Sequence, residues 1–151
     1  MIVALGSDHR GIDLKSKIAE FLKANGHTVT DFGTDSNESA DYPDFASLVA
    51  QSIIKGKAER GILICGSGIG MCITANKYKG IRAAICCKPE LAVRARLHND
   101  ANVLCLGADF VTVPEALEIV KSFIETGFEG GRHQRRLDKI SGIECSFLDN
   151  K

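Results

Sequence analysis

Residues 61–70 read GILICGSGIG, an apolar run followed by three closely spaced glycines. The run from Ile62 to Cys65 has the length and composition of a buried strand. Glycines at the entry to a helix let backbone N–H groups face a ligand oxygen. Cys65 is therefore expected at the tip of a strand, beside a glycine loop that opens a helix.

Strand-like and helical segments alternate on both sides of this stretch, which is typical of repeated βαβ units. In the first helical segment Leu14, Ile18 and Leu22 recur on one face, and Gly26 ends the pattern. The strand-like runs are residues 2–5, 28–32, 62–65, 83–86 and 103–106. Most of them are apolar throughout, which implies a parallel sheet covered on both faces. The predicted fold class is α/β, a doubly wound, Rossmann-like (flavodoxin-like) sheet of five parallel strands with helices on both faces.

Two of the later helices have recognisable ends. Asp44 is expected to cap a helix that stops at Gly56, and Pro114 suits the first turn of another that stops at Gly127. The helix after Asp44 would bury Phe45, Leu48, Val49 and Ile53.

The tail, EGGRHQRRLDKISGIE at 129–144, differs from the rest because no strand follows it. His133, Leu137 and Ile140 fall on one helical stripe, and Arg132 and Arg136 on another. A terminal amphipathic helix behind a Gly-Gly pair commonly packs on a partner subunit, which predicts a dimer. Packing on its own sheet is the alternative, and periodicity alone favours neither.

Length and composition narrow the function. A chain of 151 residues is expected to form a single domain over 1–151. Nineteen basic residues balance nineteen acidic ones, so no nucleic-acid or membrane partner is expected. With neither a signal peptide nor a membrane-spanning run, the protein is expected in the cytoplasm. Its six cysteines fit reduced thiols, and because their spacing matches no common zinc pattern, no metal is expected.

Two loops at the expected carboxyl ends of strands carry reactive groups. GSDHRG at 6–11 presents Asp8 and His9, and CGSGIG at 65–70 presents Cys65 before its glycines. The N–H groups and the start of the helix should form an anion site and favour the Cys65 thiolate. A thiolate beside anion-stabilising donors suits proton abstraction next to a carbonyl. A buried structural thiol and a dinucleotide or flavin loop are the alternatives, although this loop follows the third strand rather than the first.

His98 and Asn99 end a helical segment just before the fifth strand. In a doubly wound sheet that is the amino edge, away from Cys65 of the same chain. The pair is therefore either structural or part of another subunit's site. Arg132 and Arg136 share a helix face and either grip a phosphate or form a solvated basic surface.

Taken together, the motifs resemble the type B ribose-5-phosphate isomerases of the ribose/galactose isomerase family, whose relatives include allose-6-phosphate and galactose-6-phosphate isomerases. The resemblance covers nearly the whole chain. It comprises GSDHRG at 6–11, DYPDFA at 41–46, GILICGSGIGMCITANK at 61–77, GIRAAIC at 80–86, RLHNDANVLCLG at 96–107 and EGGRHQRR at 129–136. It implies interconversion of D-ribose 5-phosphate and D-ribulose 5-phosphate in the pentose phosphate pathway, without metal or organic cofactor.

The resemblance also implies roles for single residues. Cys65 would be the base that moves a proton between C2 and C1, His98 would open the sugar ring, and Asp8 would handle hydroxyl protons. The enediolate oxygens would be held by Gly66, Ser67, Gly68, Ile69 and Gly70. The phosphate would be gripped by His9, Arg132 and Arg136 with His133 nearby, and Tyr42 and Asn99 would line the sugar. The family forms homodimers with sites at the subunit interface, sometimes paired into tetramers.

Two positions depart from the family pattern. Ser67 stands where many relatives have threonine and keeps the hydroxyl. Asp109 stands where many carry arginine, so one phosphate contact is lost or supplied elsewhere. Three alternative functions remain: the same chemistry on allose 6-phosphate, a flavodoxin-like nucleotide-binding module, and a thiol redox protein. The galactose-6-phosphate branch is less favoured, since Cys65 and His98 are both present.

Overall fold

The computed structural model describes residues 1–146, which form one parallel sheet with strand order β2-β1-β3-β5-β4 and helices on both faces. The strands are β1 (Ile2–Ser7), β2 (Thr28–Asp31), β3 (Arg60–Cys65), β4 (Ala83–Ile85) and β5 (Val103–Gly107). The helices are α1 (Ile12–Ala24), α2 (Tyr42–Ile54), α3 (Ile69–Ala75), α4 (Pro89–Asn99), α5 (Val113–Glu125) and α6 (Arg132–Ser146). The predicted doubly wound α/β class is confirmed, with β5 between β3 and β4.

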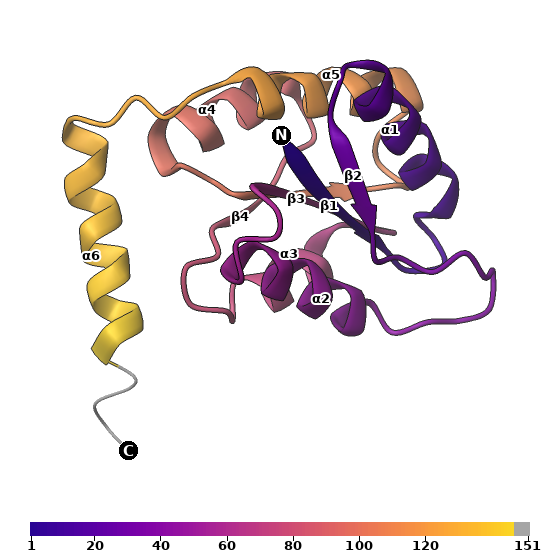
Figure 1. Ribbon diagram of the computed structural model, residues 1–151, viewed down its shortest axis with the longest axis horizontal. Coiled ribbons are helices and arrows are strands. Elements are labelled where there is room, and N and C mark those ends of the chain that lie inside the picture. The colour runs from indigo at the N-terminus through magenta and orange to yellow at the C-terminus, as the bar shows by residue number, and fades with distance from the viewer. Residues whose placement is uncertain (147–151) are drawn as a thin grey trace.

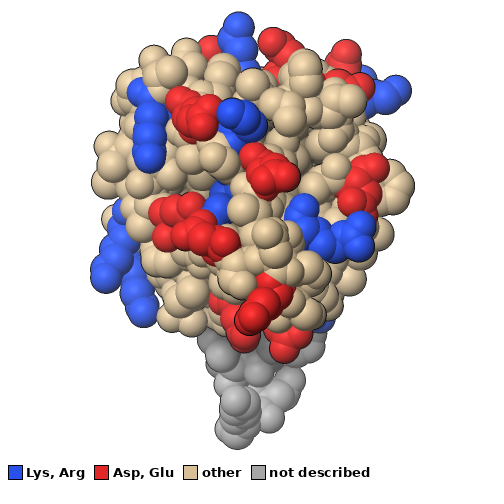
Figure 2. Space-filling view, turned by 90° about the vertical axis from the view of Figure 1, so that its right-hand side faces the viewer, with Lys and Arg blue, Asp and Glu red and all other residues tan. Residues whose placement is uncertain are grey.

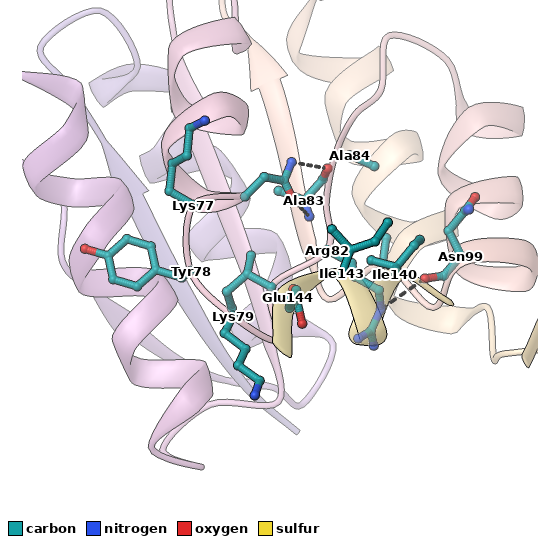
Figure 3. Close-up of a pocket in the computed structure, with 13 residues that line it drawn as sticks. Lys77, Tyr78, Lys79, Arg82, Ala83, Ala84, Asn99, Ile140, Ile143 and Glu144 are labelled. Atoms are coloured by element: carbon teal, nitrogen blue, oxygen red, sulfur yellow. Dashed lines mark hydrogen bonds between the residues drawn. The ribbon is translucent and has the colours of Figure 1, made fainter. Parts of the chain in front are cut away.

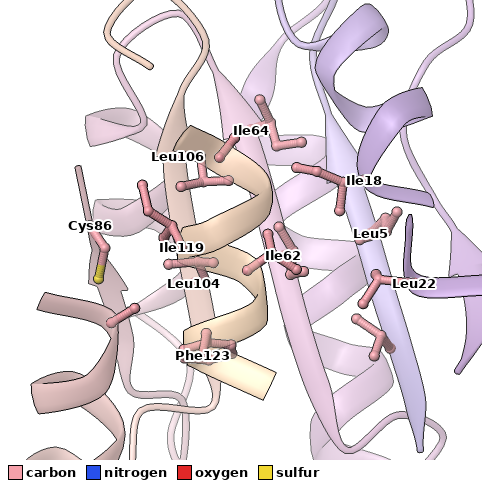
Figure 4. Packing of buried hydrophobic residues seen from close by; sticks show 14 of the residues in the cluster. Leu5, Ile18, Leu22, Ile62, Ile64, Cys86, Leu104, Leu106, Ile119 and Phe123 are labelled. Carbon is pink, nitrogen blue, oxygen red and sulfur yellow. The ribbon is translucent and has the colours of Figure 1, made fainter. Parts of the chain in front are cut away.

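Two hydrophobic cores lie on opposite faces of the sheet. Helices α1, α4 and α5 cover one face, and α2 and α3 cover the other (Figure 1). Along β3, Ile62 and Ile64 point into the first core, drawn in Figure 4, while Leu63 and Cys65 point into the second. Alternate residues of the central strands thus meet different helices, which explains why these strands are apolar throughout.

Helix α2 differs from its prediction at both its start and its buried face. It begins at Tyr42, one residue after Asp41, and Pro43 lies in its first turn. Proline fits that position because a first-turn N–H has no partner within the helix. Asp44 therefore lies inside the first turn and is not the cap. Val49 is buried as predicted, together with Ala46 and Ala50, but Leu48, also expected in the core, is 44% exposed.

The carboxyl end of α4 is fixed by a buried arginine. Arg96 is 2% exposed and donates to Asp100 at 2.8 Å and to the carbonyls of Ala101 at 2.6 Å and Thr126 at 3.1 Å. A buried guanidinium is tolerated only when its donors are matched in this way. These bonds tie the end of α4 to the segment that leads into α6.

Helix α6 stands apart from the sheet (Figure 1). It contacts α4, and Glu144 accepts a hydrogen bond from the Gly80 N–H at 3.1 Å in the segment between α3 and β4. Of its expected apolar stripe, His133 and Leu137 are buried, but Ile140 is 42% exposed. The alternative in which this helix packs on the sheet of its own chain is therefore not what the structure shows.

Charged side chains of both signs lie close together on the surface. Figure 2 shows basic and acidic side chains interspersed on the face it displays. Among residues 1–146, no helix has the length and apolar character needed to cross a membrane.

Because α2 buries Val49 and exposes Leu48, substitutions at these two positions should lower the free energy of unfolding by different amounts. Val49→Ala should lower the free energy of unfolding by roughly 2 kcal/mol, because it removes methyl groups from a packed core. Leu48→Ala should change it by less than about 0.5 kcal/mol, because that side chain is largely solvated. Urea unfolding at one fixed protein concentration measures both, and equal losses would contradict the assignment.

Candidate active site

The topology predicts a ligand site at the carboxyl end of β3. The chain leaves β1 into α1 on one face of the sheet and leaves β3 into α3 on the other, although β1 and β3 are neighbours. Ligands bind in α/β sheets at such divergence points. The loop after β1, with Asp8 and His9, and the loop after β3, with Cys65, meet there.

Cys65 is 5% exposed, and its Sγ accepts a hydrogen bond from the Gly68 N–H at 3.1 Å. Gly68 has φ +79°, and a Cβ there would lie 2.9 Å from the carbonyl carbon of Leu106. A side chain at Gly107 would lie 2.6 Å from the Ser67 carbonyl oxygen. Only glycines allow the two loops to approach so closely, so the motif serves to seat Cys65 against β5.

The rest of the glycine loop offers further hydrogen-bond donors. The Ser67 Oγ accepts from the Ile69 N–H at 3.2 Å, which leaves its own hydroxyl proton available. The N–H groups of Gly70 and Met71 belong to the first turn of α3 and have no carbonyl partner within that helix. A Cβ on Gly70 would lie 2.5 Å from the ring of Tyr42, so the tyrosine forms a wall over this end of the loop.

The loop after β1 supplies an acid and a histidine of defined tautomer. Asp8 is 6% exposed, and its Oδ1 accepts from the Arg10 N–H at 2.9 Å. The Nδ1 of His9 accepts from the Ala40 N–H at 3.1 Å. Neutral His9 must then carry its proton on Nε2, which makes that nitrogen a donor.

The other site residues expected from the sequence lie at the opposite edge of the sheet. His98 and Asn99 end α4, and just beyond them Asn102 accepts from the Gly61 N–H at 2.9 Å, at the start of β3. Because β3 is six residues long, its two ends are about 16 Å apart. A single chain therefore does not bring His98 to Cys65. Arg132 and Arg136 are exposed on α6, on the His98 side.

His133 packs beneath His98 rather than facing solvent. The two rings stack with centroids 4.4 Å apart, and Glu129 lies 3.6 Å from the His133 Nε2. Burial, and then the charge of His98, lower the pKa of His133. His133 is therefore placed to support His98, not to touch a phosphate directly.

His98, Glu129 and His133 also have the composition of a metal site, since their ligand atoms lie within 4.8 Å of one another. The ring planes, however, are only 16° from parallel. Nitrogen lone pairs lie in the ring plane, so stacked rings direct them side by side and not toward one ion. The arrangement suits a supported imidazole better than a metal centre.

A groove of about 760 Å³ lies at this same edge, between α6 and the segment that joins α3 to β4 (Figure 3). Asn99, Ile140 and Ile143 line it, with Arg82 held against α4 by bonds to the carbonyls of Asn99 at 3.1 Å and Asp100 at 2.9 Å. No local sequence pattern predicts this groove, because it forms only where α6 lies beside the segment between α3 and β4.

The cysteines differ in character, and all six are unpaired within residues 1–146. A hydrogen bond with Cys105 lowers the pKa of Cys72 to about 7, whereas burial raises that of Cys86 to about 12. Burial also raises the pKa of Cys105 well above its ordinary value. The sequence did not predict the lowered pKa of Cys72, since its partner Cys105 is distant in sequence.

Comparison with known proteins gives consistent results. The family model described as Ribose/Galactose Isomerase matches residues 3–140. The structure of Clostridium thermocellum ribose-5-phosphate isomerase B is 50% identical, with TM-score 0.96, over 97% of this chain and 99% of that one. The Mycoplasma genitalium ribose-5-phosphate isomerase B structure with bound ribulose-5-phosphate is 48% identical, with TM-score 0.91, over 95% of each chain.

A third relative shows how far this similarity extends. A D-erythrulose-4-phosphate isomerase of Pectobacterium atrosepticum is 46% identical over 94% of each chain. Proteins named for a pentose phosphate and for a tetrose phosphate are thus about equally similar to this sequence. With a family model that spans nearly the whole chain and relatives near half identity, the chain belongs to the ribose/galactose isomerase family.

Proposed function

We propose that this protein interconverts D-ribose 5-phosphate and D-ribulose 5-phosphate, with Cys65 as the base. The observation that carries the proposal is the seating of Cys65: its sulfur accepts a hydrogen bond from the Gly68 N–H at 3.1 Å, at the carboxyl end of β3. The 48% identical Mycoplasma genitalium enzyme with bound ribulose-5-phosphate supports the choice of sugar.

The proposed reaction is a proton transfer through an enediolate. His98 would assist opening of the furanose ring, with Asp8 accepting or returning a hydroxyl proton. The Cys65 thiolate would take the proton from C2 of the open aldose and return it to C1, giving the ketose. Negative charge on the intermediate oxygens would be held by N–H groups of the loop and by the Ser67 hydroxyl.

This chemistry needs two subunits. Cys65 and His98 lie at opposite edges of the sheet. We therefore propose a homodimer, alone or paired into a tetramer, in which each site combines the Cys65 edge of one chain with the His98 edge of the other. The exposed Arg132 and Arg136 of one chain would then reach the phosphate held near Cys65 of the other. The cytoplasm, where sugar phosphates are metabolised, is the proposed location.

Other substrates remain alternatives to ribose 5-phosphate. Allose 6-phosphate would use the same residues in a longer pocket, and the Pectobacterium relative adds erythrulose 4-phosphate. Family membership favours isomerase chemistry over a nucleotide-binding module or a thiol redox protein.

The first test is proton NMR of the reduced protein in deuterated buffer with each of these three sugar phosphates. Ribose 5-phosphate should give ribulose 5-phosphate fastest, with deuterium at the transferred position. Cys65→Ala should slow turnover by about a hundredfold or more, because the general base is lost, while Cys72→Ala should keep the wild-type rate. Full activity in a verified Cys65→Ala protein would eliminate Cys65 as the base.

Shared sites predict complementation between inactive chains. Co-expressed Cys65→Ala and His98→Ala chains should regain about a quarter of wild-type activity, since half the dimers are mixed and each mixed dimer has one intact site. Cys65→Ala with Asp8→Ala is the control: both changes lie at the same edge, so every mixed site keeps one defect. Equal activity in the two mixtures would argue against sites that span two chains.

The thiols predict the pH dependence of alkylation. Because the pKa of Cys72 is about 7, its thiolate fraction, and hence its rate of reaction with iodoacetamide, should rise with pH through a midpoint near 7. Cys86 should stay unreactive, since its pKa is about 12. Peptide mass spectrometry over pH 5.5–9 measures both, and a Cys72 midpoint at the value of free cysteine, about 8.5, would contradict the assignment. Inactivation by alkylation should therefore be studied in a Cys72→Ala background.

A further inference from the structure

An ion pair joins the loops that follow β1 and β5. The Arg10 Nη2 donates to the Asp109 Oδ2 at 2.6 Å. Arg10 follows Asp8 and His9 in the loop after β1, and Asp109 follows β5. The pair joins loops that are 99 residues apart in sequence.

The ion pair lies over the tip of β3. Strands β1 and β5 flank β3, so a bond between their loops crosses above Cys65 and Gly66. A Cβ built on Gly66 would lie 2.8 Å from the Arg10 Nε and 3.0 Å from the Asp109 Oδ2. One end of the glycine loop is therefore covered by a guanidinium, and the other by the ring of Tyr42.

Arg10 has donors to spare at this place. A guanidinium has five N–H donors, and Asp109 uses one of them. The Arg10 side chain is 55% exposed, and the preceding residue, His9, offers an Nε2 donor from the same loop. The planar guanidinium of an arginine can donate to two oxygens of a phosphate at once, a geometry that the ammonium group of a lysine does not provide.

The geometry points to Arg10 as a substrate-binding residue of this chain: its guanidinium, oriented by Asp109, binds the phosphate of the sugar whose other end reaches Cys65. Asp109 is then a positioning residue, which holds the guanidinium over the tip of β3. This inference rests on the proposed function, because it names a residue that binds the phosphate of the proposed substrate.

A simpler role for Arg10 would be to neutralise Asp109, and steady-state kinetics with ribose 5-phosphate separate the two. Arg10→Ala should raise KM about tenfold or more with kcat changed less than threefold, and should raise the inhibition constant of inorganic phosphate similarly. The double variant Arg10→Ala/Asp109→Ala should stay impaired. If Asp109→Ala instead restores KM, Arg10 acts only by neutralisation and the inference is wrong.

Two further variants sharpen the test. Arg10→Ala/Asp109→Arg returns a guanidinium to the same place from the opposite loop and should recover most of the lost affinity. Lys17→Ala is the matched control, because Lys17 is also 55% exposed and ion-paired but lies on α1; its KM should stay within twofold of wild type.

The two proposals fail in different ways. If the wild-type protein does not turn over ribose 5-phosphate, the proposed function is wrong, and titration of the wild type and Arg10→Ala with inorganic phosphate by calorimetry still tests the anion site. If the wild type is active but Arg10→Ala leaves both KM and phosphate inhibition unchanged, the assignment of Arg10 is overturned.

Discussion

The contact between the loops after β3 and β5 fixes the position of the Cys65 thiol. Ala108 donates to the Cys65 carbonyl at 2.9 Å, and Asp109 to the Gly66 carbonyl at 3.0 Å. These bonds form only because Gly68 and Gly107 have no side chains to separate the two backbones. Cys65 is thus held by main-chain geometry, and its sulfur meets the Gly68 N–H without depending on any flexible side chain.

The separation of Cys65 from His98 follows from the βαβ plan itself. Strands of a parallel sheet end at one edge, and the helices that return the chain end at the other. A residue at a strand end and a residue at a helix end are therefore kept apart in one subunit, whatever the sequence. A fold of this kind unites them only by placing the carboxyl edge of one subunit against the amino edge of another.

Local sequence predicted the sheet well because burial on both faces leaves a clear pattern. The buried face of α2 was predicted less well, because Leu48 is apolar but faces away from the core. Tertiary packing decides which face of such a helix is buried. The loops with Asp8 and Cys65 were predicted from residue type and topology. The Arg10–Asp109 pair and the stacking of His133 on His98 were not, because each joins segments distant in sequence.

The two glycines before α6 form a joint, and a rotation there is amplified along the length of the helix. Gly130 and Gly131 have φ of +71° and +55°, which other residues adopt only with strain. Fifteen residues of α6 extend about 22 Å beyond them. A rotation of about 5° at this joint would move the far end by about 2 Å, so the position of Ile143 in its groove depends on torsion angles set more than ten residues earlier. A small change in torsion at one glycine pair thus becomes a larger displacement at the opposite end of the helix.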